Sequence, residues 1–323
     1  GLDIFLPEFL QQVKEVQSSG RQPEPLNGSF AVADQRALAE RLMNQLGFDF
    51  DFGRLDVSHH PFTGGVPDDV RITTRYYEDD FTQSLMGVLH ETGHALYERG
   101  LPSQWRHQPV GTARGMTMHE SQSLIIEMLA CRSEEFVRYL TPLVKETFGG
   151  SGPAWEAENL VRHYRRVQPG LIRVDADEVT YPAHVILRYR LEKNLISGDL
   201  TVADLPGAWN EAMQKSLGLT PPDDRDGVLQ DIHWPSGAFG YFPTYTLGAM
   251  AAAQLFDAAQ NDNDAVVIGL EHGDFGPLLS WLRTHVHALG SLMSTQDLMV
   301  RATKKPLDVE VYKAHLTRRY LGG

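Results

Sequence analysis

Residues 80–100 read DFTQSLMGVLHETGHALYERG, and this stretch carries the clearest fold signal in the chain. Asp80 followed by Gln83 is typical of a helix N-terminus, and Gly100 supplies a stop signal. The apolar side chains between them repeat at helical spacing: Phe81, Leu85, Leu89 and Leu96. The sequence therefore predicts a helix of about five turns over residues 80–99.

The middle of this helix contains two histidines around a glutamate. His90 and His94 are four residues apart, so they share one helix face and can hold one metal ion. Glu91, next to the first histidine, can reach a water bound to that ion. This layout is typical of a zinc hydrolase. The alternative is a helix whose histidines are ordinary polar side chains of the core or surface.

A catalytic zinc ion usually has three protein ligands, so a third donor is expected after His94. The spacing excludes some families. A metzincin would have Gly and His where this chain has Tyr97 and Gly100. The glutamate found nineteen or twenty residues further on in many aminopeptidases is replaced by Ala113 and Arg114. Neither class fits this chain.

The next acidic residue after Glu98 is Glu120, within the segment MTMHESQ at residues 116–122. This segment opens a second run of apolar residues at helical spacing. We predict that Glu120, at the start of this helix, is the third ligand. The alternative is a capping box in which Thr117 and Glu120 only stabilise the helix N-terminus.

Six motifs in this order resemble the carboxypeptidase Taq family of metallocarboxypeptidases. The first two are HETGH at residues 90–94 and HESQ at 119–122. Four others match the family patterns HPF, DxRxT, IRxxAD and GxxQDxHW: HPF at 60–62, DVRIT at 69–73, IRVDAD at 172–177 and GVLQDIHW at 227–234. The resemblance extends from about residue 60 to residue 322.

The resemblance implies a zinc-dependent carboxypeptidase that removes C-terminal residues from peptides one at a time. Zinc, for which cobalt can substitute, would be held by His90, His94 and Glu120. Glu91 would act as the general base. Arg173 would bind the terminal carboxylate of the substrate, because its planar fork can form two parallel hydrogen bonds.

Other motif residues receive supporting roles. Arg71 is expected to line the cleft or to pair with a neighbouring acid such as Asp69. Asp175 and Asp177 are expected to position Arg173 and the local backbone.

Candidates for stabilising the negative oxygen of the tetrahedral intermediate are His233, Tyr241 and Tyr245. Either tyrosine could equally be a core aromatic residue. His60 and His119 adjoin motif positions and are expected to form hydrogen bonds behind the ligands.

Two alternative functions remain open at this point. A related endopeptidase or oligopeptidase would use the same three ligands but would not need Arg173. The second alternative is a truncated, non-catalytic metal-binding module. It is suggested by the 59 residues before His60, where the family carries a longer helical region. We expect the chain to be the C-terminal portion of the family's usual chain, with weaker hydrolysis of long peptides.

Composition indicates a single catalytic domain over residues 1–323. Lys and Arg total 29 against 42 Asp and Glu, and the net charge of -13 disfavours nucleic acid and anionic membranes as partners. The only cysteine, Cys131, is expected to be a core residue in a reducing, cytoplasmic compartment. The sequence contains no signal-like or membrane-spanning stretch. The expected partners are peptide substrates, and a homodimer is compatible with the sequence.

Helical periodicity dominates the chain, so the predicted fold is mainly α with a small β element. The expected helices cover residues 34–46, 80–99, 117–148, 154–167, 180–197, 202–217, 245–259 and 275–289. Residues 48–77, and residues 70–76 most clearly, alternate like a strand. We expect this strand to lie beside the active-site cleft, where it could pair with an extended peptide.

Overall fold

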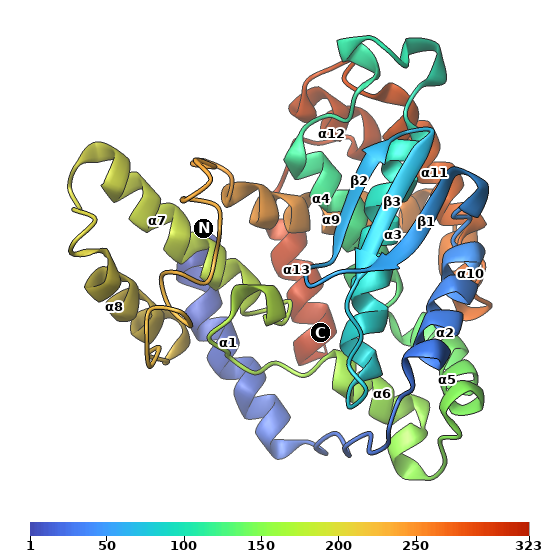
Figure 1. The fold of residues 1–323 in the computed structure, drawn as a ribbon, viewed down its shortest axis with the longest axis horizontal. Coiled ribbons are helices and arrows are strands. Elements are labelled where there is room, and N and C mark those ends of the chain that lie inside the picture. Colours follow the sequence, from blue (N-terminus) through green and yellow to red (C-terminus); the bar gives the residue numbers. More distant parts are fainter. Residues whose placement is uncertain (323) are drawn as a thin grey trace. The chain divides into compact units, whose positions relative to one another are not determined.

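The computed structural model describes residues 1–322 (Figure 1). These residues contain thirteen α-helices and one three-stranded sheet, joined by loops and short helical turns. The predicted mainly helical class is confirmed. Contacts divide the chain into two compact units. Unit 1 contains Gly1–Gln22, Arg165–Leu247 and Tyr312–Gly323, and unit 2 contains Pro23–Tyr164 and Gly248–Val311.

The sheet of unit 2 occupies the segment that was predicted to be extended. Its strands are β1 (Gly53–Val57), β2 (Phe62–Val66) and β3 (Asp69–Thr74), in the order β1-β3-β2. The central strand β3 is parallel to β1 and antiparallel to β2, which leaves β2 at one edge. Val70, Ile72 and Thr74 of β3 are buried, as expected for a sheet with one face against a core. Figure 1 shows this sheet lying over α3.

Helix α3 (Phe81–Gly100) is the central helix of unit 2 and the predicted metal-binding helix. It begins as the sequence predicts, because the side chain of Asp80 accepts a hydrogen bond from the Thr82 backbone N–H. Its buried face includes Phe81, Leu85 and Leu89.

The next predicted helix, over residues 117–148, is interrupted. Helix α4 (Met116–Leu124) runs into a π-helical turn (Ile125–Ala130), and α5 (Glu134–Phe148) starts afresh with Ser133 capping the N–H of Phe136. The apolar pattern continues through the break, so periodicity alone could not reveal it. Wide turns of this kind often occur at functional sites, and this one carries Glu127.

The remaining helices of unit 2 are shorter. They are α2 (Val32–Gln45), α6 (Ala157–Tyr164), α10 (Ala265–Glu271), α11 (Gly276–His285) and α12 (Thr295–Thr303). Helix α9 (Pro243–Asp262) begins in unit 1 and continues in unit 2. Helices α10 and α12 were not predicted, since neither is longer than nine residues and a short helix shows little periodicity.

Unit 1 is built on α1 (Leu2–Ser19), α7 (Tyr181–Ser197), α8 (Leu205–Leu217) and most of α13 (Val309–Leu321). Helices α7 and α8 pack together around Leu187, Leu191, Trp209 and Met213. The sequence analysis missed α1, although its buried residues Leu2, Leu6, Phe9 and Val13 follow helical spacing.

A buried carboxylate anchors the C-terminal helix of unit 1. Glu178 accepts hydrogen bonds from His315 Nε2 and Arg319 Nη1, both at 2.8 Å, and from the Tyr320 hydroxyl at 2.9 Å. Burial alone would raise the pKa of Glu178, but the charges of Arg319 and His315 bring it well below its usual range. This ion-pair cluster ties α13 to the segment that follows Arg173.

Among the described residues, no helix combines the length and the apolar character needed to span a lipid bilayer.

Candidate active site

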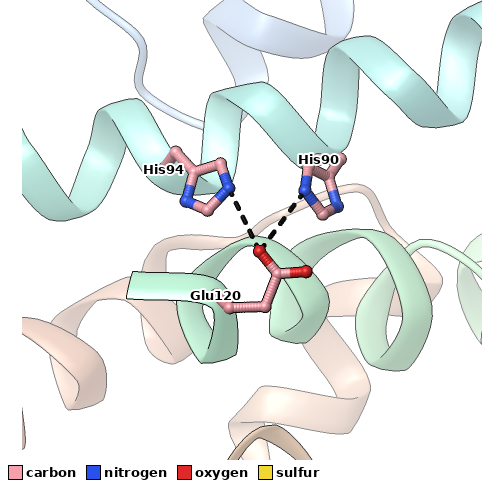
Figure 2. Close-up of side chains that lie close together, drawn as sticks. All are labelled: His90, His94 and Glu120. Carbon is pink, nitrogen blue, oxygen red and sulfur yellow. Dashed lines mark ion pairs between the residues drawn. The ribbon is translucent and has the colours of Figure 1, made fainter. Parts of the chain in front are cut away.

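Two imidazole nitrogens and one carboxylate oxygen face one another in unit 2. Glu120 Oε2 lies 3.5 Å from His94 Nε2 and 3.9 Å from His90 Nε2, and the three ligand atoms all lie within 4.8 Å of one another (Figure 2). Ligands held about 2.0–2.1 Å from a tetrahedral zinc ion would be roughly 3.4 Å apart. Donor type and spacing therefore both fit a metal ion at this point.

Two glycines, one on α3 and one on α9, let these helices pack closely against α4, the helix that carries Glu120. A Cβ atom at Gly93 of α3 would lie only 2.6 Å from the Gln122 carbonyl oxygen of α4. A Cβ at Gly248 of α9 would lie 2.8 Å from Cβ and Cγ of Glu120. Real Cβ atoms do not come this close to their neighbours. Both positions thus require glycine for Glu120 to reach the histidines of α3.

The N-terminus of α4 tests the capping-box alternative for Glu120. The helix starts at Met116 with Gly115 as its N-cap and without a side-chain capping hydrogen bond. Thr117 lies inside the helix, so the capping-box alternative was wrong. The Glu120 carboxylate instead points toward the two histidine rings, as Figure 2 shows.

His90 has a charged partner behind it. Its Nδ1 lies 2.9 Å from Glu127 Oε2, and the other oxygen of Glu127 accepts from Arg132 Nη2 at 2.5 Å. Burial opposes protonation of His90, but the carboxylates of Glu127, Glu120 and Glu91 outweigh it and raise the pKa of His90 to about 10. A metal ion at Nε2 must therefore displace a proton.

His94 has a different partner, a second imidazole. Its Nδ1 lies 2.7 Å from His119 Nδ1, and His119 Nε2 lies 2.8 Å from Glu98 Oε1. With a metal ion on His94 Nε2, the Nδ1–H of His94 donates to His119, whose Nε2–H then donates to Glu98. Burial lowers the pKa of His94, which favours the neutral, metal-binding form. His119 thus has the predicted supporting place, whereas the side chain of His60 is exposed.

The sequence analysis missed three residues whose side chains contact His90, His119 or Glu91. Glu98 follows His94 by four residues and so shares its helix face, which is a usable signal. Glu127 follows Glu120 by seven residues, about two helical turns, which is a weaker one. Thr63 directly follows the HPF motif, and its hydroxyl lies 2.6 Å from Glu91 Oε2. Periodicity carried no signal for that contact.

The predicted carboxylate-binding arginine lies in unit 1, in the short turn Arg173–Asp175. Arg173 Nε and Nη2 donate to Asp231 Oδ1 at 3.0 and 2.8 Å, and Arg188 Nε donates to Asp231 Oδ2 at 2.6 Å. Both arginine side chains are buried. Burial would raise the pKa of Asp231, but Arg188 and Arg173 lower it. Within this triad two positive charges share one negative charge, which leaves a formal surplus of one.

Asp177 does not pair with Arg173. Its carboxylate accepts from the backbone N–H groups of Gln168, Val179 and Thr180, at 2.9–3.0 Å, and so shapes the loop around the turn. The Arg173 side chain is held by Asp231 instead. The expected link between Asp177 and Arg173 is therefore indirect and passes through the backbone.

Three further predicted residues lie in unit 1 with Arg173 and contact one another. His233 Nε2 is 3.0 Å from the Tyr245 hydroxyl, and its ring contacts Tyr241 at a centroid distance of 5.3 Å. The Arg173 guanidinium lies 4.6 Å from the centre of the Tyr245 ring. Residues predicted separately from two motifs thus form one cluster. The metal-ligand candidates and Glu91 lie in unit 2.

Comparison with known proteins identifies the family. Residues 4–320 match the family described as carboxypeptidase Taq (M32) metallopeptidase. The chain belongs to this family. It is 42% identical over 308 residues to thermostable carboxypeptidase 1 of Thermus thermophilus and 39% identical over 314 residues to carboxypeptidase 1 of Bacillus subtilis.

Solved structures of M32 proteins show the same fold. Metallocarboxypeptidase 1 of Trypanosoma cruzi matches with a TM-score of 0.95 and 45% identity, covering 99% of this chain and 67% of that one. The M32 carboxypeptidase of Deinococcus radiodurans matches with a TM-score of 0.92 and 37% identity, covering 98% and 65%. The two curated relatives are matched over 94% and 95% of this chain but only 60% and 62% of their own length. The chain therefore spans about three fifths of those relatives.

The M32 motifs HPF and DxRxT fall on neighbouring strands. HPF ends at Phe62, the first residue of β2, and DxRxT covers most of β3. Arg71 of DxRxT is exposed and pairs with Asp69, with Nη2 2.8 Å from Oδ2. This is the simpler of the two roles expected for Arg71.

Proposed function

We propose that this M32 chain is a metal-dependent carboxypeptidase that shortens peptides from their C-terminus. The observation that carries the proposal is the convergence of His90, His94 and Glu120 on one point, with Glu91 beside them on α3. The names of the relatives support it, since those proteins are called carboxypeptidases.

The proposed metal is zinc, with cobalt as a substitute. Two imidazoles and one carboxylate are a common ligand set of catalytic zinc, and they leave a position for water. Once bound, the ion supplies Lewis acidity, which polarises the scissile carbonyl and acidifies water.

The protein's own groups would divide the remaining work. Glu91 is nearly buried, with 7% of its surface exposed, and carries the carboxylate next to His90. It accepts the proton of the attacking water and passes it to the leaving amine. His233, Tyr241 and Tyr245 are proposed as hydrogen-bond donors to the negative oxygen of the tetrahedral intermediate.

Arg173 is the proposed carboxylate anchor. Its Nε and Nη2 are engaged by Asp231, while the surplus positive charge of the Arg173, Arg188 and Asp231 triad favours a further anion. Arg188 is the less suitable of the two arginines, because it also donates to the His184 carbonyl and to Gln230 Oε1. An endopeptidase would not need Arg173 as a carboxylate anchor.

A reducing compartment such as the cytoplasm is part of the proposal. Its support is Cys131, which is buried and free among the described residues. An inert, buried thiol of this kind suits such a compartment.

The test is a competition between two peptides of identical sequence, one with a free C-terminus and one amidated, followed by mass spectrometry in the presence of zinc. We expect a ladder of products from the free peptide and no cleavage of its amidated twin. The variant Glu91→Gln should keep its metal and lose turnover.

Arg173→Ala should lower kcat/KM by about 30- to 1,000-fold, which corresponds to about 2–4 kcal/mol. The control is Arg190→Ala, because Arg190 is an exposed arginine of the same unit paired with Asp3. Internal cleavage, or equal rates on both peptides, would favour the endopeptidase. Bound metal without any hydrolysis would favour a non-catalytic module.

A further inference from the structure

Thr63 contacts the proposed general base from a neighbouring strand. Its Oγ1 lies 2.6 Å from Glu91 Oε2 and 2.9 Å from the Glu91 backbone carbonyl oxygen. Thr63 belongs to β2, whereas Glu91 lies in the middle of α3, 28 residues later. The hydroxyl therefore reaches the carboxylate from outside the helix that carries it.

We propose that Thr63 is a positioning residue that holds the Glu91 carboxylate in its reactive orientation; this rests on the carboxypeptidase function proposed above. A glutamate side chain has three rotatable bonds, and α3 alone does not fix its far end. A hydrogen bond to an ionised oxygen is short and about twice as strong as a neutral one. With Oε2 held by Thr63, Oε1 is left to accept a proton from water.

The contact between Thr63 and Glu91 persists through the second half of the reaction. A threonine hydroxyl has one proton and two lone pairs. While Glu91 is ionised, this proton is donated to Oε2. When Glu91 has taken a proton from water on Oε1, Oε2 becomes the carbonyl oxygen of the neutral carboxyl group and still accepts from Thr63. Glu91 then gives its proton to the leaving amine, and Thr63 keeps its own throughout.

The sheet fixes Thr63 independently of α3. Thr63 is paired with Ile72 of β3, and cross-strand partners project to the same face of a sheet. Ile72 is fully buried, so Thr63 shares the face that lies against α3. At Gly65, φ is +108° and a Cβ would lie 2.1 Å from the Asp69 carbonyl oxygen. The glycine thus allows the tight pairing of β2 with β3 that places the hydroxyl.

The experiment compares Thr63→Val, which keeps the shape and removes the hydroxyl, with Thr63→Ser, which keeps the hydroxyl. Thr73→Val is the matched control, because Thr73 lies on β3 of the same sheet and its hydroxyl donates to the His60 carbonyl instead of to Glu91. For each variant, kcat, KM and zinc affinity are measured, and a crystal structure of the zinc-loaded protein shows the orientation of Glu91.

Thr63→Val should lower kcat by about 10- to 100-fold, while KM and zinc affinity stay within about threefold of wild type. Thr63→Ser should restore most of kcat, and Thr73→Val should resemble wild type. In crystals, the Glu91 carboxylate should move in Thr63→Val and keep its place in Thr63→Ser.

An unchanged kcat and an unchanged Glu91 orientation in Thr63→Val would overturn the proposal. So would a serine variant as impaired as the valine variant. If the wild-type protein binds zinc but hydrolyses no peptide, the proposed function fails, and the orientation of Glu91 in the variants still decides whether Thr63 positions it.

Discussion

Replacing His119 by alanine should weaken zinc binding without removing any of the three proposed ligands. His119 Nδ1 lies 2.7 Å from His94 Nδ1, on the side of the ring opposite the metal-facing nitrogen. The alanine variant leaves the Nδ1–H of His94 without this partner. The side chain of His94 is only 13% exposed, so water can replace the lost hydrogen bond only in part.

The size of the effect follows from this contact. A nearly buried polar group that loses its partner costs about 1–3 kcal/mol. Loss of a hydrogen-bonding partner behind a metal ligand typically weakens metal binding by about 10- to 100-fold. Glu98→Gln should weaken it by less than about tenfold, because the amide oxygen can still accept from His119 Nε2 and only the negative charge is lost.

Competition with a chromophoric chelator at fixed pH measures zinc affinity directly. The control is His107→Ala, which removes an exposed histidine from the loop after α3. Cobalt-substituted protein gives a second readout, since its visible spectrum reports on ligand geometry. Wild-type affinity in His119→Ala would refute this reasoning. A larger loss in Glu98→Gln than in His119→Ala would show that charge, rather than ring orientation, governs the site.

Two further predictions concern stability, measured by urea unfolding of the metal-free protein. Gly93→Ala should destabilise the folded protein by about 1–3 kcal/mol, because its Cβ would lie 2.6 Å from the Gln122 carbonyl oxygen. The control Gly87→Ala, in the same helix, places its Cβ in open space and should stabilise the protein by up to about 1 kcal/mol. Equal effects of the two substitutions would contradict the close helix contact at Gly93. Burial, with smaller contributions from neighbouring cations, lowers the pKa of His287 to about 3. Below its unfolded-state pKa of about 6.5 only the unfolded chain takes up this proton, so about 2–3 kcal/mol should be lost between pH 6.5 and 4.5. His287→Gln should reduce that loss, and parallel pH curves for the two proteins would argue against a buried neutral imidazole.

The sequence predicts the helical part of the metal site because helix geometry is regular. Two histidines four residues apart must share a face of α3, whatever surrounds it. Glu120 could be proposed because the chain offers no acidic residue between it and Glu98. Its actual approach to the histidines depends on Gly93 and Gly248, where the helices pack closely. Sequence spacing alone does not contain that information.

Contacts across the fold were less accessible to prediction. Glu127 lies 37 residues from His90, and Thr63 lies 28 residues from Glu91. Such pairs are set by the packing of separate elements, and no local pattern reports them. The π-helical turn that carries Glu127 escaped notice for a related reason, because its apolar residues keep the same spacing as the helices beside it.

The central claim is that His90, His94 and Glu120 together hold one metal ion. Zinc content after exhaustive dialysis, measured by elemental mass spectrometry on wild type and on Glu120→Ala, tests it most directly. We predict about one zinc ion per wild-type chain and a large loss in the variant, because two histidines alone leave the ion one protein ligand short. Equal zinc content in the two proteins would contradict the claim and remove Glu120 from the ligand set.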